Sequence, residues 1–504
     1  MFAQGEIEAL RLSRNDLQGT ARGQAMAGAF GALGGDVTGV GINPAGLGVY
    51  RSSEINATLN FSSQNMESNF GNLTDSERKN KFNFSNISYV GYYPTGNESG
   101  LSTINFAFSY NRLKDFNRKY TSSASGMNHS LSNYIAEMTN ANNNPSPAQL
   151  GGTDAYYNYN WLSVLGWDGY LMNENDDGDK YVSVLRNNET TSPRLNVIEK
   201  GQIETFDFSL GTNFSDNFYI GGTFSLTEID YRMFSYYQET LGKTTDIFYL
   251  DNYYKTNGSG YQFKLGAIWR PVDCLRLGVA YHSPTWYSMS DYYYGDTEFY
   301  YQNDIGADII SKAGTPSDSY DYRFRTPYGW TFSAAGILGT QAILSLDWEI
   351  KDYRSMNYRD RYGDETGADI EQNNIIDEDY RMASTLRLGA EYRFTPQVAG
   401  RFGFAYAQNP YEETYRDGLR ETVINGTIPH YMIEGDITSV TAGIGYRFSP
   451  QVYLDFAFVY RTQTDRLYYF PSIWDENGSS LVSSVPAEVK NKACTGLVTL
   501  GYKF

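Results

Sequence analysis

The sequence predicts an all-β protein, a 14-stranded antiparallel transmembrane β-barrel with a small N-terminal hatch inside the lumen and long extracellular loops. From Glu54 onward, apolar and polar residues alternate with a period of two, the pattern of strands with one apolar and one wet face. Short and long connections alternate between these segments. The chain also lacks an apolar run of the roughly 18 residues that a helical membrane span requires.

The last segment shows the alternation clearly. Val498, Leu500 and Tyr502 share one face, whereas Thr499 and Lys503 lie on the other. The same rule predicts strands at 54–64, 82–93, 101–112, 204–214, 218–231, 258–270, 275–286, 322–337, 341–353, 380–394, 398–408, 437–448, 452–463 and 491–504. A soluble propeller also has many short strands, but not this regular succession of short and long connections, so the pattern favours a barrel.

The connections distinguish the two ends of the barrel. Tight turns are expected at 215–217, 271–273, 395–397 and 449–451, and long loops at 65–81, 113–203, 232–257, 287–321, 354–379, 409–436 and 464–490. Outer-membrane barrels have short periplasmic turns and longer extracellular loops. The aromatic strand end Tyr502 and Phe504 resembles the signal that the outer-membrane assembly machinery reads. We therefore expect a monomer in the bacterial outer membrane, in contact with outer-membrane lipids.

The N-terminal residues do not follow the strand pattern. The stretch from Gly19 to Gly48 is rich in Gly and Ala, and such a compact segment can fold into a barrel lumen as a plug. This predicts a hatch segment at 1–50 and a barrel at 51–504 that includes the long extracellular loop 113–203. Met1 to Gln4 are interpreted as the remnant of a cleaved export signal.

Four short motifs suggest a family. They are Gly23-Gln24-Ala25-Met26-Ala27-Gly28-Ala29, Asn43-Pro44-Ala45-Gly46-Leu47, Gly278-Val279-Ala280-Tyr281-His282-Ser283-Pro284 and Arg325-Thr326-Pro327-Tyr328-Gly329-Trp330. With these motifs the chain resembles the FadL/TodX family of outer-membrane transporters of hydrophobic compounds. The resemblance implies a hatch motif at Asn43, Pro44, Ala45 and Gly46. It also implies capture of apolar ligands outside the cell, a lumenal pocket beside the hatch and release through the barrel wall.

The third predicted strand departs from the family. In the family this strand is interrupted and creates a lateral opening, whereas here Ile104, Phe106, Phe108 and Tyr110 alternate without an intervening Gly or Pro. The sequence therefore does not indicate a lateral exit at this strand.

Two sets of residues are candidates for ligand binding. Tyr157, Trp161, Leu165 and Trp167 form an apolar stretch in the long loop and suit ligand capture, although such residues also serve to hold a long loop together. Arg276, Arg387 and Arg401 are predicted to face the lumen. They are candidates for binding a carboxylate headgroup, with pairing to lumenal acids as the alternative.

Several kinds of chemistry are disfavoured. A net charge of -18 and a pI near 4.7 argue against nucleic-acid binding. The acidic turn from Asn173 to Asp179 resembles a calcium loop but lacks its bidentate acid, because Val184 stands at the twelfth position. His129, His282 and His430 occur without a haem motif, and no Gly-x-Ser-x-Gly or His-Glu-x-x-His motif is present. We expect no enzyme activity, cofactor or metal.

The expected function is passive uptake of hydrophobic or amphipathic small molecules, such as long-chain fatty acids. An alternative is a FadL-like attachment or shuttle barrel of type IX secretion, which binds a protein partner. Such a partner would contact the extracellular loops at 113–203 and 287–321.

Overall fold

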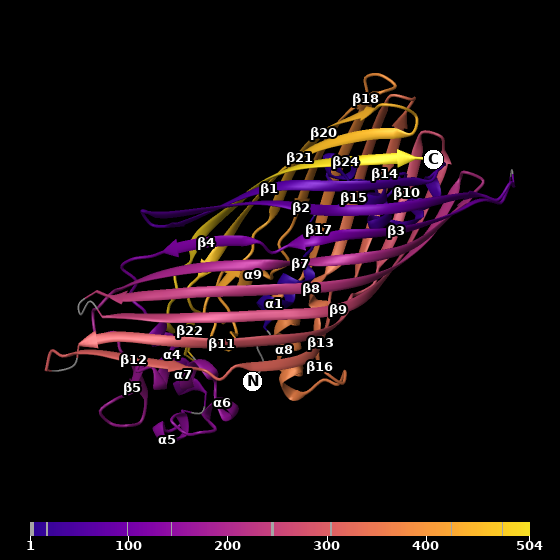
Figure 1. Cartoon of the computed structure of the whole chain (residues 1–504). Helices are drawn as coiled ribbons and strands as arrows, with labels where there is room; N and C mark the ends of the chain where they lie inside the picture. The colour runs from indigo at the N-terminus through magenta and orange to yellow at the C-terminus, as the bar shows by residue number, and fades with distance from the viewer. Residues whose placement is uncertain are drawn as a thin grey trace.

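The computed structural model shows a closed antiparallel barrel of 14 strands (Figure 1). It describes residues 5–16, 19–97, 99–142, 144–242, 246–302, 305–424, 426–475 and 477–504, so the expectation for Met1 to Gln4 lies outside the described residues. Around the wall the strands are β1 (Glu54–Phe70), β2 (Leu73–Pro94), β3 (Leu101–Asp115), β7 (Thr191–Phe214), β8 (Phe218–Leu241), β9 (Ile247–Val272), β10 (Leu275–His282), β14 (Gly329–Leu338), β15 (Ala342–Asp352), β17 (Met382–Arg393), β18 (Val398–Ala407), β20 (Ile437–Arg447), β21 (Val452–Tyr468) and β24 (Ala487–Lys503).

The first and last strands close the barrel. β1 pairs with β2 on one side and with β24 on the other, where Glu54 lies opposite Lys503 and Asn69 opposite Glu488. Closure removes the free sheet edges that would be costly in lipid. The predicted 14-stranded antiparallel barrel is therefore confirmed.

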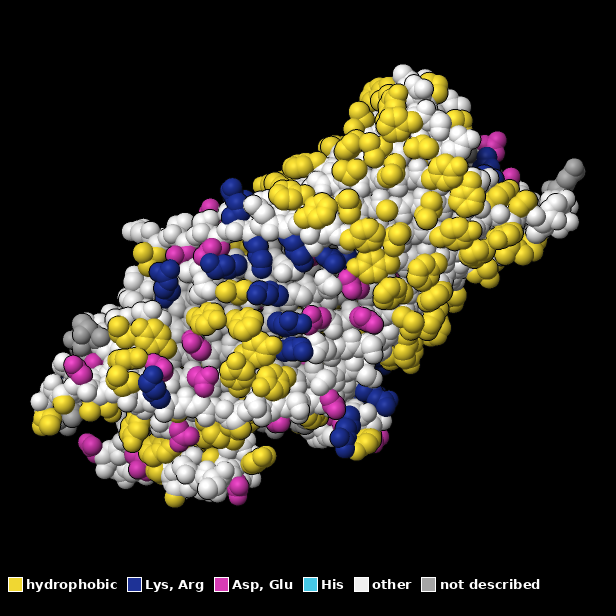
Figure 2. Space-filling view, viewed as in Figure 1, with side chains coloured by type: hydrophobic (Ala, Val, Ile, Leu, Met, Phe, Trp, Pro, Cys, Tyr) yellow, Lys and Arg dark blue, Asp and Glu magenta, His cyan; other side chains and the backbone are white. Residues whose placement is uncertain are grey.

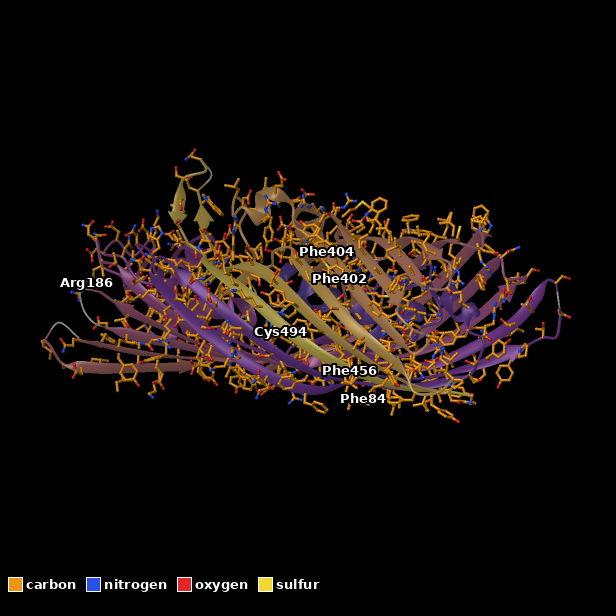
Figure 3. All side chains as sticks on the ribbon, turned by 90° about the horizontal axis from the view of Figure 1, so that it is seen from above. Phe84, Arg186, Phe402, Phe404, Phe456 and Cys494 are labelled. Atoms are coloured by element: carbon orange, nitrogen blue, oxygen red, sulfur yellow. The ribbon has the colours of Figure 1, made fainter. Side chains whose placement is uncertain are left out.

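An apolar belt covers the outside of the barrel (Figure 2). Its side chains include Phe84, Phe402 and Phe456, which lie on the outer wall and are exposed (Figure 3). Such a belt is the lipid-facing surface of an outer-membrane barrel. The short turns, such as 394–397 between β17 and β18, lie at the periplasmic end. Among the described residues, no helix is long and apolar enough to cross a membrane.

Two predicted strands are each broken by a proline. The segment 275–286 divides into β10 and β11 (Trp286–Gln302), and 322–337 divides into β13 (Asp318–Arg325) and β14. Pro284 and Pro327 lie in the breaks and have no N–H group for the ladder. The breaks lie side by side, because the Thr326 N–H donates to the Thr285 carbonyl at 3.1 Å. β9 therefore pairs with β10 near the periplasm and with β11 further out.

Several predicted loops are instead strands that extend beyond the apolar belt. The expectations for 65–81, 232–257 and 287–321 are corrected, because β1, β2, β8, β9, β11 and β13 continue through them. Apolar and polar residues still alternate along these extensions, because one face of each strand packs against an extracellular core. Shorter strands complete this extension: β4 (Arg118–Ser123), β12 (Asp308–Gly314), β16 (Asn357–Asp360) and β19 (Tyr431–Ile433).

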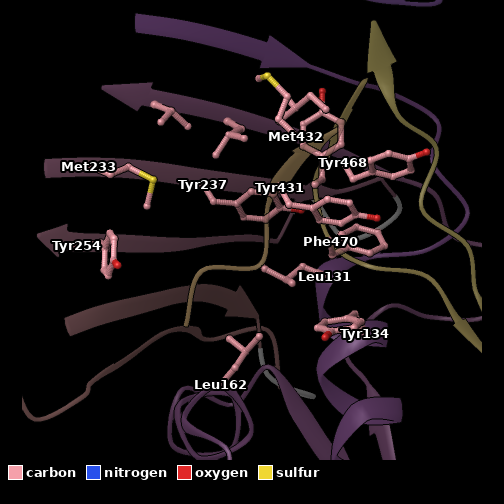
Figure 4. Close-up of a cluster of buried hydrophobic side chains, with 14 of the residues drawn as sticks. Leu131, Tyr134, Leu162, Met233, Tyr237, Tyr254, Tyr431, Met432, Tyr468 and Phe470 are labelled. Atoms are coloured by element: carbon pink, nitrogen blue, oxygen red, sulfur yellow. The ribbon is translucent and has the colours of Figure 1, made fainter. Parts of the chain in front are cut away.

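The remaining extracellular segments fold over a tyrosine-rich core (Figure 4). They contain α4 (Leu131–Ala141), α5 (Pro147–Leu150), α6 (Ala155–Asn158), α7 (Trp161–Asp168), β5 (Met172–Glu174), β6 (Tyr181–Ser183), η2 (Tyr353–Ser355), α8 (Gly367–Asp379), α9 (Glu413–Arg416), β22 (Ile473–Trp474) and β23 (Ser480–Val482). Tyr237, Tyr431, Tyr468 and Phe470 are among the buried side chains of this core. The long loops thus form a compact lobe.

The N-terminal segment runs inside the barrel. It contains α1 (Glu6–Ser13), α2 (Ala21–Ala25), α3 (Val37–Ile42) and η1 (Pro44–Val49). Thr20 and Asp36 cap α2 and α3 through their side-chain oxygens, which explains where these short helices begin. The side chains between Thr20 and Tyr50 are largely buried against the inner wall.

Candidate functional site

The segment from Thr20 to Tyr50, here called the hatch, lies between two cavities in the lumen. The outer cavity has a volume of about 360 Å³ and touches the hatch at Gln24, Thr38 and Ile42. The inner cavity has a volume of about 500 Å³ and touches it at Arg22 and Leu33. The inner cavity is also lined by the periplasmic turns 339–341 and 395–397. The hatch therefore separates an outer from a periplasmic compartment.

Asn43 fastens the centre of the hatch to the wall. Its Nδ2 donates to the Gly31 carbonyl at 2.7 Å, to the Ala267 carbonyl of β9 at 3.2 Å and to the Val279 carbonyl of β10 at 3.4 Å. Its Oδ1 accepts from the Ala45 N–H at 3.1 Å, so it also caps η1. One buried amide thus holds the hatch, its own turn and two strands together.

A set of wall glycines admits the hatch backbone at close range. A Cβ atom at Gly221 would lie 2.3 Å from the Pro44 carbonyl carbon, and one at Gly266 would lie 1.9 Å from Asn43 Oδ1. Hatch backbone lies this close to Gly211, Gly221, Gly278, Gly389 and Gly403, and hatch side chains lie this close to Gly266 and Gly443. Gly211 lies opposite Gly221, and Gly221 lies opposite Gly266, so three of them form a continuous row. The absence of side chains there lets the hatch contact the wall directly.

Polar wall residues complete the attachment. Asp347 of β15 accepts hydrogen bonds from the Phe30 N–H at 3.0 Å and the Gly31 N–H at 2.9 Å. On the other side of the lumen, Thr499 accepts from the Ala21 N–H at 2.7 Å and Asn105 donates to the Leu47 carbonyl at 2.9 Å. Buried backbone groups are costly when unpaired, so these contacts stabilise the closed position.

Charged side chains line the outer cavity, and most of them are paired. Glu349 accepts from Lys351 at 2.8 Å and also pairs with Arg387. Lys264 of β9 differs, because it is 7% exposed and the described residues provide no acceptor for its ammonium group. It lies opposite His282 of β10, whose Nε2 contacts the Ile42 carbonyl at 2.7 Å. Lys264 is therefore a buried cation that faces the cavity beside the hatch.

Apolar side chains share the same cavity. Leu12 of α1, Val37 and Ile42 of the hatch, and Val459 of β21 contribute to its lining. The cavity thus combines apolar surface with the positive charge of Lys264, which suits an amphipathic molecule with an anionic end.

The wall beside this cavity contains an interruption in the sheet. The backbone ladder of β2 and β3 ends at Asn86 and Asn111, although β2 continues outward to Leu73 and stays paired with β1 beyond a bulge at Ser85. Side chains bridge the interval, because Asn83 donates to Asp115 at 2.6 Å and Lys81 pairs with Asp115 at 3.0 Å. These three residues also line the outer cavity. The sequence did not indicate this interruption, because β3 keeps its alternation and contains no Gly or Pro where its ladder with β2 ends.

The predicted headgroup residues lie in two different places. Arg387 lines the outer cavity but is paired with Glu349. Arg276 donates to the Leu33 carbonyl, and Arg401 pairs with Glu391 at 2.7 Å, both at the inner cavity. Lys264 was not singled out by the sequence, because the pattern places it among many lumenal charges and does not show which are paired.

The predicted capture residues do not form an exposed aromatic patch. Tyr157 is 87% exposed, but Trp161 and Leu165 are buried and Trp167 is half-buried. Trp161 packs against Tyr293 of β11 with ring centroids 4.9 Å apart, and its Nε1 donates to the Tyr156 carbonyl at 2.8 Å. The four predicted capture residues therefore do not share an exposed surface, and Trp161 joins α7 to the strand extension, as the loop-stabilising alternative expects.

Helix α1 forms the outer boundary of the cavity, and the sequence did not reveal it. Arg14 at its end pairs with Glu434 at 3.1 Å, and Asp16 pairs with Arg461. Glu6 at its start is fully buried and accepts from the Tyr415 hydroxyl at 2.9 Å. Burial, with Asp379 nearby, raises the pKa of Glu6 to about 8.

The histidines and acidic residues do not converge on a metal site. Within the described part of the chain, no group of three or more His, Cys, Asp or Glu side chains is placed to hold a metal ion. His129 accepts from the Ser483 N–H at 2.6 Å, and burial lowers the pKa of His430 to about 3. In the segment from Asn173 to Asp179, the first two residues belong to β5 and the others connect β5 to β6.

Comparison with known proteins gives a consistent result. The sequence matches the family described as Outer membrane protein transport protein (OMPP1/FadL/TodX) over residues 207–504. No curated protein sequence matches the chain. The fold is similar to a Pseudomonas aeruginosa FadL homologue, with a TM-score of 0.54 and 15% identity over 98% of this chain and 100% of that chain. It is also similar to the P. putida toluene transporter TodX, with a TM-score of 0.50 and 12% identity over 97% and 99% of the two chains.

Proposed function

Because the chain belongs to the OMPP1/FadL/TodX family of outer-membrane transport proteins, we propose that it takes up an amphipathic small molecule with an anionic end, such as a long-chain fatty acid. The protein is a transport channel for hydrophobic compounds in the bacterial outer membrane and is not an enzyme. The single observation that supports the anionic end is Lys264, a buried and unpaired cation beside the hatch.

In the proposed complex, the anionic end contacts Lys264 while the apolar part lies against Leu12, Val37 and Ile42. An ammonium group held away from bulk water binds a carboxylate more strongly than an exposed one does. An incoming carboxylate would supply the acceptor that the described residues do not provide for the Lys264 ammonium group.

The hatch blocks the direct route to the periplasm, because its backbone contacts the wall glycines and Asn43 holds it in place. We place the exit at the side-chain bridge between β2 and β3, where Asn83, Asp115 and Lys81 replace backbone hydrogen bonds. Such side-chain contacts can break without loss of the backbone hydrogen bonds between neighbouring strands. Transport by this route requires no energy source beyond the concentration gradient.

The test is native mass spectrometry of the detergent-extracted protein, with lipid extraction of whatever stays bound. Wild type is expected to retain one anionic amphiphile, Lys264→Gln to lose it, and Lys264→Arg to keep most of it because the charge remains. Asn43→Ala is expected to retain it weakly, because the adjacent hatch residue Ile42 is no longer held. Lys492→Gln, on the exposed outer face of β24, is the matched control.

Equal retention by wild type and Lys264→Gln would contradict the role of Lys264. The alternative function, attachment of a protein in type IX secretion, predicts a different result. An empty barrel that carries a bound protein on its extracellular lobe would favour that alternative over transport.

A further inference from the structure

A row of positive charges crosses the outer surface of the barrel above the apolar belt. Lys200 of β7 lies directly opposite Arg232 of β8, and Arg232 lies directly opposite Lys255 of β9. All three side chains are on the outward face, where Lys200 and Arg232 are exposed and Lys255 is half-buried. Figure 2 shows dark-blue side chains gathered between the yellow belt and a second yellow area.

Neighbouring side chains compensate this row of cations only in part. Like charges directly opposite one another on neighbouring strands repel and destabilise a sheet. Asp230 pairs with Arg232 at 3.1 Å, but the described residues place no carboxylate within ion-pair distance of Lys200 or Lys255. The chain as a whole carries a net charge of -18, so a row with excess positive charge is not a consequence of composition.

An exposed aromatic surface adjoins the row on its extracellular side. The next position toward the extracellular end is aromatic on β8 and β9, at Phe234 and Tyr253, and Tyr294 of β11 lies opposite Tyr253, whereas β7 has Ile198 there. The Phe234 and Tyr253 ring centroids are 4.8 Å apart, and those of Tyr253 and Tyr294 are 5.4 Å apart. Tyr236 and Tyr294 are 46% and 36% exposed. The negative faces of such rings attract the C–H groups of sugars, and exposed patches of this kind mark interaction sites.

The order of these surfaces along the strands indicates one kind of partner. From the membrane outward, the strands present belt residues such as Phe206, Leu226 and Tyr261, then polar and acidic side chains that include Glu204, Glu228 and Asp230, and then the cations. Aromatic rings follow the cations on β8 and β9. In a phosphorylated glycolipid, the phosphates likewise lie beyond the acyl chains, and sugars lie beyond the phosphates. We propose that this face binds the phosphorylated saccharide headgroup of an outer-leaflet glycolipid.

The height of the cations favours a glycolipid over a phospholipid. Each cation lies six residues from the outermost apolar belt residue of its strand: Lys200 from Phe206, Arg232 from Leu226 and Lys255 from Tyr261. Six residues correspond to about 20 Å along a strand and, at a tilt of about 45°, to roughly 14 Å in height. The polar layer of a phospholipid leaflet is only about 5 to 8 Å thick. Phosphates carried on a layer of sugars reach the cations, whereas phospholipid phosphates lie below them.

The experiment measures binding of purified protein in nanodiscs to rough-type lipopolysaccharide. Lys200→Gln/Arg232→Gln/Lys255→Gln is expected to weaken binding at least tenfold and to reduce its dependence on salt. The control Lys312→Gln/Arg359→Gln/Arg416→Gln removes the same charge from other surface positions whose cations are already paired with Glu298, Glu365 and Asp417. This control is expected to bind as wild type does, and heat-modifiable migration of each variant verifies a folded barrel.

Three further probes distinguish the parts of the headgroup. Dephosphorylated lipopolysaccharide is expected to bind wild type as weakly as the native lipid binds the triple variant. Tyr236→Ala/Tyr294→Ala is expected to weaken binding of a glycolipid with a full core saccharide but not of one truncated to its innermost sugars. Equal binding of phosphorylated and dephosphorylated lipid would overturn the proposal. Inorganic pyrophosphate that competes as well as the intact lipid would show a site for small anions instead.

Discussion

Glu6 shows how one side chain can make an attachment depend on pH. It is fully buried in α1, where Tyr415, Asp379 and Glu8 are the titratable groups that act on it. Tyr380 also binds this turn, because its hydroxyl donates to the Glu6 carbonyl at 2.7 Å. Because burial, with Asp379 nearby, raises the pKa of Glu6 from 4.5 to about 8, the acid is protonated in the docked helix at neutral pH.

The docking of α1 is therefore expected to weaken as pH rises. Below about pH 4.5 Glu6 is protonated both docked and released, so it adds no pH dependence. Between about 4.5 and 8 only the released state ionises, so the docked state loses stability with rising pH, and above 8 the loss is complete. Tryptic cleavage at Arg11 and Arg14 is expected to accelerate across this interval.

Glu6→Gln, which mimics the protonated acid, is expected to flatten this pH profile. Glu8→Gln is the control, because Glu8 lies on the same helix, pairs with Arg11 at 3.1 Å, is partly exposed and has the smallest effect among the groups that act on Glu6. An unchanged slope in Glu6→Gln would assign the pH dependence to another group, with Asp379 as the first candidate, because burial raises its pKa to about 6.

At the level of elements, the hatch packs closely against the wall strands because the strands have glycines at the points of contact. Gly211, Gly221 and Gly266 lie on three successive strands, and residues Asn43 to Gly48 occupy the space that their side chains would fill. The hatch supplies Asn43, whose amide bonds to β9 and β10. Short helices with few turns have little stability of their own, so this contact holds the segment in one conformation.

Gly221→Val is expected to displace the hatch without preventing barrel formation. A Cβ atom there would meet the Pro44 backbone at 2.3 Å, and backbone cannot move aside as a flexible side chain does. Planar-bilayer recordings are expected to show higher ion conductance than wild type.

Gly336→Val is the matched control, because a Cβ atom at Gly336 has no atom within 4 Å. If Gly221→Val conducts as little as wild type does while its barrel is folded, the hatch is not held by this close contact.

At the level of the whole molecule, closure depends on the last strand. β24 pairs with both β21 and β1, and the Phe504 N–H donates to the Ser53 carbonyl at 3.0 Å. Phe504 itself is 60% exposed at the periplasmic rim and stacks with Tyr502 at 6.1 Å. The ring thus contributes little burial to the finished barrel and is available during assembly.

Phe504→Ala is expected to reduce the amount of assembled barrel severalfold while leaving the stability of the assembled fraction nearly unchanged. Heat-modifiable migration of outer-membrane fractions measures both quantities. Phe448→Ala is the control, because Phe448 is also an exposed aromatic residue beside a periplasmic turn but is not terminal. Equal yields of the two variants would argue against a signal in the final residue.

The sequence alone determined the strands, their number and the end of the barrel at which the short turns lie. It could do so because each strand separates lipid from lumen, and that separation imposes the two-residue alternation seen at Val498, Leu500 and Tyr502. The same local rule continued into the extracellular extension, so it did not show where the membrane ends.

Only the tertiary structure decided which polar residues are paired and which are free. In the sequence, Arg276, Arg387 and Lys264 all occupy positions that are predicted to face the lumen. In the structure, Arg387 is paired with Glu349, Arg276 lies on the periplasmic side of the hatch, and Lys264 faces the outer cavity without an acidic partner among the described residues. The burial of Trp161, the docking of α1 and the row of Lys200, Arg232 and Lys255 depend in the same way on residues far apart in the chain. Such contacts are set by strand register and packing, and local periodicity carries no information about them.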